Sequence, residues 1–294
     1  MQPSKNLLSA IKPFQIISLL TTYTLGAGLV QYVQVMQSWL TLIQGLLFLL
    51  LISVGLEFLV LLLEVNDQLG SFKNLSIKDK KQRRINSALI SATFFTVAVA
   101  IFVDWINKGI LWQGFGFLIA LLGLSAFLYV LVKIDIISRS YEILFETILF
   151  VIIPPAFAYF TQSEDLHRLL TMTVFSLIPA FIAFRLLSKL IAFDRYPKLG
   201  RHTLIVNLGW EQIMFIHNAL IFITFLLYAL NAVFGFPWFL LWPVFLTLPI
   251  GLLEVWLMER VRRGGKPLWR VMQVATACVY LIPIYLIGFA FWIR

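Results

Sequence analysis

The sequence predicts an all-α, polytopic membrane protein in which about nine transmembrane helices form a single bundle around a central cavity. Hydrophobic residues make up 61% of the chain and charged residues only 13%, whereas soluble domains carry about 25% charged residues. The apolar runs approach the roughly 20 residues that span a bilayer as a helix, and they are far too long for the strands of a membrane barrel. We find no soluble domain, linker or low-complexity tract, so residues 1–294 are expected to form one transmembrane domain.

The first three spans are expected at residues 14–33, 38–64 and 86–106. Lys5 and Lys12 precede the first apolar run, but no small-residue cleavage site follows it. This run is therefore interpreted as a retained helix and not as a signal peptide.

The middle three spans are expected at residues 112–132, 142–161 and 167–190. They contain Pro154, Pro155 and Pro179. A proline inside a membrane helix frees a carbonyl that neighbouring helices must satisfy. These positions either widen the central cavity or are ordinary kinks.

The last three spans are expected at residues 208–232, 237–258 and 271–292. Pro243, Pro249 and Pro283 mark further irregularities of the same kind. The single cysteine, Cys278, lies among apolar neighbours, where a small packed side chain is expected.

The distribution of Lys and Arg predicts the orientation. With nine spans and a cytoplasmic N-terminus, the inner segments hold 20 of the 23 basic residues, and only Lys108, Arg168 and Arg294 fall outside. Basic residues concentrate on the cytoplasmic side of membrane proteins. The net charge of +9 therefore suits an anionic membrane surface as partner, and a nucleic-acid partner is not expected.

Two polar segments, residues 64–70 and 194–204, follow the second and sixth spans, and each belongs to a basic loop on the predicted cytoplasmic side. Meeting across the bundle, they would frame one cavity for a phosphate-bearing lipid. Glu64 and Asp67 continue one helical face with the deeper Glu57. The two outer residues face the cavity or cap the helix, and Glu57 has a polar partner or is protonated.

Arg185 and Lys189 lie one turn apart near the end of the sixth span. They could hold a diphosphate, with the arginine as a fork and the lysine as a point charge. The alternative is that both extend to the lipid headgroups.

Other isolated polar groups occur on the fifth, seventh and eighth spans. Glu142 and Glu146 lie one turn apart, so one of them is neutral or paired with Arg139. His217 and Glu254 are expected to make hydrogen bonds between helices, as is Asn218. The spacing of His167 and His202 does not support a zinc site.

Several segments resemble the UbiA superfamily of intramembrane prenyltransferases. The matching stretches, in chain order, are Lys12-Pro13-Phe14-Gln15, Asn66-Asp67, Arg83-Arg84-Ile85-Asn86-Ser87, Gly200-Arg201-His202-Thr203-Leu204 and Val206-Asn207-Leu208-Gly209. The family's two Asp-rich motifs are reduced here. Gly70 and Asn74 replace two aspartates of the first motif, and Ala192 and Tyr196 occupy the aspartate positions of the second.

The resemblance implies transfer of an isoprenoid chain from a prenyl diphosphate to a lipophilic acceptor, aromatic or a quinone precursor, with Mg²⁺ as cofactor. Asp67 and Asp194 would be the catalytic residues. The metal ligands implied are Asp67, Asn66, Glu64 and Asp194. The residues implied to bind substrate are Asn66, Arg185, Lys189, Lys198 and Arg201.

Two other functions stay open. A non-catalytic relative could bind an isoprenoid lipid or scaffold a partner enzyme, which the missing aspartates favour. A transporter or a phospholipid-headgroup enzyme is disfavoured, because the span count is odd, no clear inverted repeat is present, and the chain lacks a D-G-x-x-A-R stretch.

Overall fold

A computed structural model describes residues 12–64, 77–110, 113–193 and 204–293. Every regular element in these ranges is a helix, and nine helices there are long and apolar enough to cross a membrane. The predicted all-α, multi-pass fold is confirmed. The observed spans agree with the predicted ones to within a few residues at most ends.

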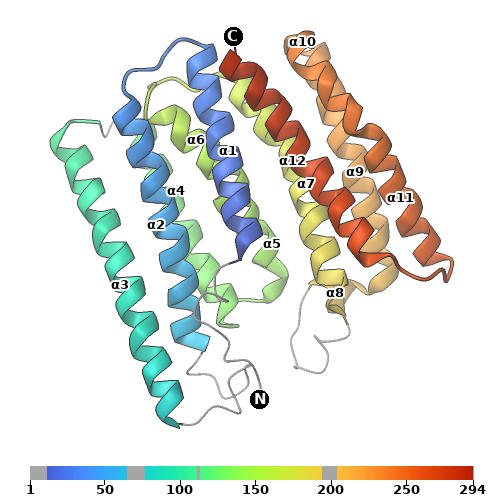
Figure 1. The fold of residues 1–294 in the computed structure, drawn as a ribbon, viewed down its shortest axis with the longest axis horizontal. Coiled ribbons are helices and arrows are strands. Elements are labelled where there is room, and N and C mark those ends of the chain that lie inside the picture. Colours follow the sequence, from blue (N-terminus) through green and yellow to red (C-terminus); the bar gives the residue numbers. More distant parts are fainter. Residues whose placement is uncertain (1–11, 65–76, 111–112, 194–203, 294) are drawn as a thin grey trace.

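The first four helices are long and largely regular. They are α1 (Pro13–Tyr32), α2 (Trp39–Glu64), α3 (Ile77–Asn107) and α4 (Gln113–Lys133). Pro13 opens α1, a position at which the missing N–H costs no hydrogen bond. Figure 1 shows successive helices running in alternate directions through the bundle.

The fifth span is broken into four pieces. These are η2 (Arg139–Tyr141), α5 (Glu142–Thr147), the π-helical η3 (Ile148–Ile152) and α6 (Ile153–Phe160). Pro154 has no N–H to donate to the carbonyl of Phe150 one turn earlier. Ser18 Oγ (3.3 Å) and Thr22 Oγ1 (3.0 Å) of α1 donate to that carbonyl instead. The expectation that a neighbouring helix satisfies a carbonyl freed by proline is confirmed here.

The second half of the chain adds the remaining spans. They are α7 (Arg168–Leu190), the short α8 (Leu204–Leu208), α9 (Trp210–Val233), α10 (Trp238–Leu241) with η6 (Trp242–Thr247) and α11 (Leu248–Arg262), and α12 (Trp269–Ile293). The 3-10 segment η6 contains Pro243 in its first turn. Pro179 and Pro283 lie inside continuous helices.

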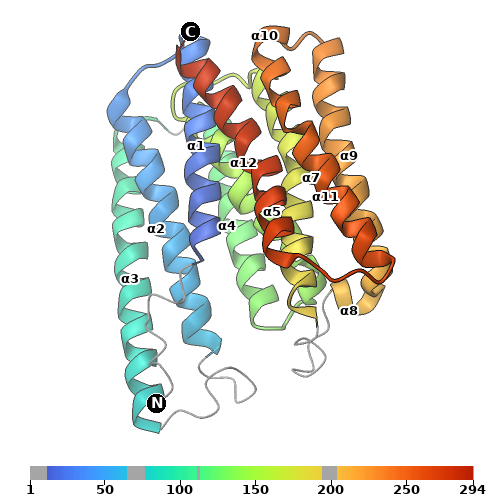
Figure 2. The same cartoon turned by 45° about the vertical axis from the view of Figure 1, so that its right-hand side comes forward.

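The interior of the bundle is formed by α1, by the α5–α6 span and by α7, the most buried spans, whereas α3 lies at one edge and packs mainly on α2. Figures 1 and 2 show α9 and α11 at the opposite edge. The approach of α1 to α6 requires a glycine. A Cβ atom added to Gly26 would lie 2.3 Å from the carbonyl oxygen of Pro155.

One end of the bundle gathers the helix ends that lead into the two polar segments. The C-terminal ends of α2 and α7 lie at this end, together with α8, while the chain's C-terminus lies at the other (Figure 1). Figure 2 shows that α1 begins well inside the bundle, above the lower ends of α2 and α3. The polar segments themselves, from residue 65 to 70 and from 194 to 203, lie outside the described residues.

Candidate functional site

Charged and hydrogen-bonding side chains from five helices meet in the half of the bundle that contains the C-terminal ends of α2 and α7. We call them the ion-pair network, and its members are Lys12, Gln15, Glu57, Tyr129, Lys133, Glu142, Glu146, Arg185 and Lys189. They belong to α1 and the residue before it, α2, α4, α5 and α7. Charged groups inside a membrane protein mark functional candidates because leaving them unpaired is costly.

Glu146 is the centre of the network and is completely buried. Arg185 holds it with two hydrogen bonds, Nε to Oε2 at 2.6 Å and Nη2 to Oε1 at 2.8 Å. Gln15 Nε2 donates to Oε1 at 3.0 Å, and Lys133 Nζ lies 3.4 Å from the same oxygen. A two-pronged arginine contact fixes the carboxylate in orientation as well as in charge.

Glu142 lies one turn before Glu146 on α5 and makes a second set of ion pairs. Its Oε2 accepts a hydrogen bond from Lys189 Nζ at 2.8 Å, and its Oε1 is in close contact with Lys133 Nζ. Residues one turn apart share a helical face, and α5 and α7 run in opposite directions. Glu146 therefore meets Arg185 while Glu142 meets Lys189, as two rungs of an antiparallel ladder.

A second arm of the network lies between α1 and α2. Glu57 accepts a hydrogen bond from the Tyr129 hydroxyl at 2.6 Å, and Lys12 Nζ lies 3.2 Å from both of its carboxylate oxygens. The Tyr129 ring also lies 5.0 Å from Lys133 Nζ, so it joins the two arms. The sequence left open a polar partner for Glu57, and the structure supplies two.

Counted as ionised groups, the network contains four cations and three carboxylates. The surplus charge is positive, and Lys12 is the most exposed of the cations, with 39% of its side chain accessible. A surplus of positive charge favours an incoming anion.

Arg185 and Lys189 lie one turn apart on α7, and each pairs with a glutamate of α5; their role as a diphosphate-binding pair stays a prediction. The structure does not support their extension to the lipid headgroups, because both are held in buried ion pairs with α5. The other predicted substrate residues, Asn66, Lys198 and Arg201, lie outside the described residues.

The predicted metal ligands cannot be located in the described part of the chain. Asp67, Asn66 and Asp194 fall outside it, and Glu64 is described only as the last residue of α2. Among the described residues, no group of three or more His, Cys, Asp or Glu side chains could hold a metal ion. The described residues alone therefore do not fit Mg²⁺.

Of the two alternatives that the sequence left open for Glu142 and Glu146, the pairing with Arg139 is wrong. Arg139 does not pair with Glu142 or Glu146; its Nη2 donates to Asp135 Oδ2 and to the Lys133 carbonyl, at 2.8 and 2.9 Å. Glu142 and Glu146 have their cations on α4 and α7 instead. Arg139 is near both glutamates in sequence, but its side chain contacts the segment that joins α4 to η2.

Sequence reasoning missed four members of the network: Lys12, Gln15, Tyr129 and Lys133. A signal for two of them was present, because Lys12 and Lys133 flank apolar spans at the end where the buried glutamates lie. Three glutamates within spans need partners of opposite charge. Gln15 and Tyr129 carry no such signal, since neutral polar residues occur on many membrane helices.

A smaller polar cluster joins α9, α11 and α12. His217 Nε2 lies 2.9 Å from Glu254 Oε1, which also accepts a hydrogen bond from Thr276 Oγ1, and all three side chains are fully buried. The predicted hydrogen bond between helices is confirmed for Glu254, which accepts from Thr276, whereas His217 reaches Glu254 only as a close ion-pair contact. Asn218 Oδ1 lies 3.3 Å from His217 Nδ1 on the same helix.

The fold and the network define a multi-pass helical membrane protein with a buried charged site. No protein-family model matches the chain. No curated protein matches it either. The function of the site is therefore argued from the residues and their geometry.

Proposed function

We propose that the protein is a divergent, UbiA-like membrane prenyltransferase. It would transfer an isoprenoid chain from a prenyl diphosphate to a lipid-soluble acceptor, aromatic or a quinone precursor. The observation that carries the proposal is the surplus of positive charge in the ion-pair network, at the end of the bundle where α2 and α7 lead into the two polar segments. Apolar helices surround this charge, which suits a substrate with an anionic head and a hydrocarbon tail.

The chemistry requires that a diphosphate leaves. The bond between the prenyl carbon and the diphosphate oxygen breaks with both electrons going to the diphosphate. A new bond then forms from that carbon to the acceptor, which loses a proton. Arg185 and Lys189 favour this step because positive charge stabilises the departing anion in a site from which water is excluded.

The two cations reach a diphosphate by exchanging partners. Each now binds a glutamate carboxylate at 2.6–2.8 Å, and phosphate oxygens offer arginine and lysine the same kind of acceptor. Lys198 and Arg201 would add charge from the second polar segment.

In this proposal four residues would hold Mg²⁺: Glu64, Asn66, Asp67 and Asp194. Their side chains lie outside the described part of the chain. Oxygen ligands of this kind suit the ion, which would neutralise part of the diphosphate charge when bound. Because the described residues do not form a metal site, the roles assigned to Arg185 and Lys189 do not depend on it.

The test is a transfer assay with purified protein, labelled geranylgeranyl diphosphate and a membrane extract as the source of acceptor, with products separated by chromatography. We expect a labelled lipid product that requires Mg²⁺, its loss in Asp67→Ala, and its retention in Arg262→Gln, which removes an exposed cation of α11. Absence of any such product, or an Asp67→Ala variant as active as the unchanged protein, would overturn the proposal.

A second candidate function is binding of an isoprenoid lipid without transfer, or scaffolding of a partner enzyme. It is favoured by the pairing already present, since Arg185, Lys189 and Lys133 all have carboxylate partners within the described residues. This function predicts that an isoprenoid lipid copurifies in the presence of a metal chelator. A strict requirement for Mg²⁺ in lipid binding would count against it.

We also propose that the end of the bundle carrying the network faces the cytoplasm. The basic residues concentrate in the segments at this end. With nine spans, a reporter fused after Arg294 should then lie outside: alkaline phosphatase fused there should be active and green fluorescent protein dark. The opposite pair of results would reverse the orientation.

A further inference from the structure

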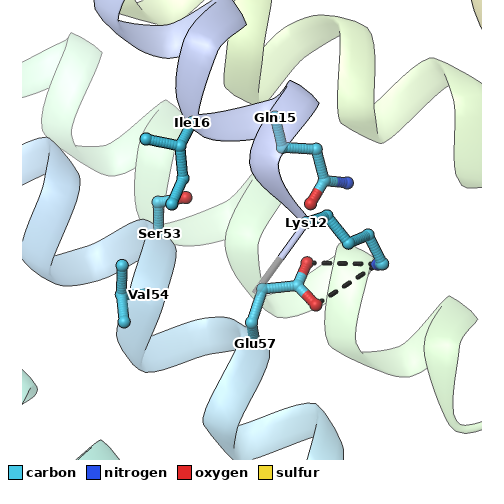
Figure 3. Close-up of a pocket in the computed structure, with 6 residues that line it drawn as sticks. All are labelled: Lys12, Gln15, Ile16, Ser53, Val54 and Glu57. Carbon is cyan, nitrogen blue, oxygen red and sulfur yellow. Dashed lines mark hydrogen bonds and ion pairs between the residues drawn. The ribbon is translucent and has the colours of Figure 1, made fainter. Parts of the chain in front are cut away.

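A small pocket opens between α1 and α2 beside the ion-pair network (Figure 3). Its cavity volume is about 10 Å³, which is room for about one water-sized group such as a hydroxyl. The lining residues are Lys12, Gln15, Ile16, Ser53, Val54 and Glu57. The pocket therefore adjoins the charged site without being filled by its ion pairs.

One polar atom at this pocket lacks a partner among the described residues. Gln15 is only 2% exposed, and its Nε2 donates to Glu146, but its buried Oε1 accepts no hydrogen bond from any residue that the structure describes. Figure 3 shows Oε1 turned toward the other lining residues and Nε2 turned away from them. A buried acceptor without a donor is costly, and such groups are rare in folded proteins. A hydrogen-bond donor on a bound molecule would satisfy this acceptor.

The charges around the pocket indicate what kind of donor fits. Glu57 is already neutralised by Lys12, whose ammonium lies 3.2 Å from both carboxylate oxygens. The pocket thus offers no free cation for a phosphate and no free carboxylate for an ammonium group. Its remaining polar side-chain atoms are the amide oxygen Oε1 of Gln15 and the hydroxyl of Ser53, which suit a neutral ligand group.

Apolar atoms complete the lining. Ile16 and Val54 are half-buried, so they form part of the rim between the pocket and its surroundings, whereas Gln15 and Ser53 are buried. A ligand that satisfies both features has a small neutral donor at one end and hydrocarbon behind it. A hydroxyl group on an amphiphile has this form.

We propose that this pocket binds the hydroxyl head of a lipid alcohol or phenol, which donates a hydrogen bond to Gln15 Oε1. The hydrocarbon part contacts Ile16 and Val54. The assignment deepens the proposed function and rests on it in one respect, namely that the bound hydroxyl compound is the acceptor. Binding of the hydroxyl head itself is a property of the pocket alone.

The experiment measures equilibrium binding of tritiated farnesol and of farnesyl methyl ether, which has no donor, to the purified full chain without any prenyl diphosphate. One hydrogen bond to an otherwise unpaired buried acceptor corresponds to roughly tenfold in affinity. We expect the protein to bind farnesol about tenfold more tightly than the ether. In Gln15→Leu, farnesol should fall to the affinity of the ether, and the ether should be unaffected.

Two variants control for folding and location. Gln162→Leu removes a buried glutamine from a different cluster, where its amide contacts Ser38 and Thr41, and should keep the tenfold preference. Val54→Trp fills the rim and should weaken both ligands. Should Gln15→Leu fail to fold, the unchanged protein and Val54→Trp still decide the question.

Equal affinity for alcohol and ether in the unchanged protein would overturn the proposal and leave water as the occupant. A preference that survives in both Gln15→Leu and Val54→Trp would place the hydroxyl elsewhere and overturn it as well. A failed transfer assay with the tenfold preference intact would remove only the prenyltransferase function, so the two failures are distinguishable.

Discussion

Removal of the central carboxylate is the sharpest test of the ion-pair network. In Glu146→Gln the side chain keeps its shape, but one of its oxygens becomes an NH₂ group. Because Arg185 donates to both oxygens, one of its N–H groups then faces another donor. The surplus of positive charge in the network also rises from one to two, inside a region that excludes water.

The expected cost follows from this geometry. Removing one partner of a buried ion pair destabilises proteins by about 3–5 kcal/mol, since the remaining charge stays buried. For chains of 150–250 residues, 1 kcal/mol corresponds to about 2–4 °C in melting temperature. We therefore expect Glu146→Gln to melt about 6–20 °C lower. The double variant Glu146→Gln/Arg185→Gln restores the surplus of one and should be more stable than the sum of the single effects by about 2 kcal/mol.

The assay is thermal unfolding of the purified protein in one detergent, with Glu259→Gln as matched control. Glu259 also pairs with two arginines, Arg262 and Arg263, but on the exposed surface of α11. Exposed ion pairs contribute little, so the control should melt close to the unchanged protein. A Glu146→Gln variant as stable as this control, or additive effects in the double variant, would refute the buried network.

Two further variants test the packing around the network. Gly26→Ala places a Cβ 2.3 Å from the Pro155 carbonyl oxygen and should lower the stability by about 1–3 kcal/mol through overpacking. The control Gly116→Ala has open space around the added atom and should change the melting temperature little. Equal melting temperatures of the two variants would contradict the close α1–α6 contact. Tyr129→Phe removes the hydroxyl that donates to Glu57 and should lower the stability by about 1–3 kcal/mol. The control is Tyr141→Phe, which changes an exposed tyrosine. Equal melting temperatures of these two variants would show that the Tyr129–Glu57 hydrogen bond contributes nothing to stability.

The fold could be predicted because its main determinant is local. A run of about 20 apolar residues in lipid has to satisfy its own backbone, which leaves a helix, so each span can be located without knowledge of its neighbours. The proline interruptions were also visible, but the side chains that satisfy the freed carbonyls were not. That Phe150 accepts from Ser18 and Thr22 depends on α1 lying beside η3, which no local pattern specifies.

The charged site could be predicted only in part for the same reason. Arg185 and Lys189 share a helical face of α7, a feature of helix periodicity that the sequence shows. Their partners come from α5, and Lys133 comes from α4. Which side chains pair between helices depends on how each helix is rotated about its axis and how deep it sits in the bundle. The hydropathy of the sequence does not encode either quantity.

The composition of the network limits what can bind there. A diphosphate carries more negative charge than a surplus of one cation neutralises, so further positive charge must accompany it. Two sources are predicted from the sequence: the basic pair Lys198 and Arg201, and Mg²⁺ held by the acidic and amide side chains of the polar segments. An uncharged isoprenoid needs neither. If the protein is a transferase, its binding of prenyl diphosphate must therefore depend on a divalent cation or on Lys198 and Arg201, whereas a lipid-binding protein would show no such dependence.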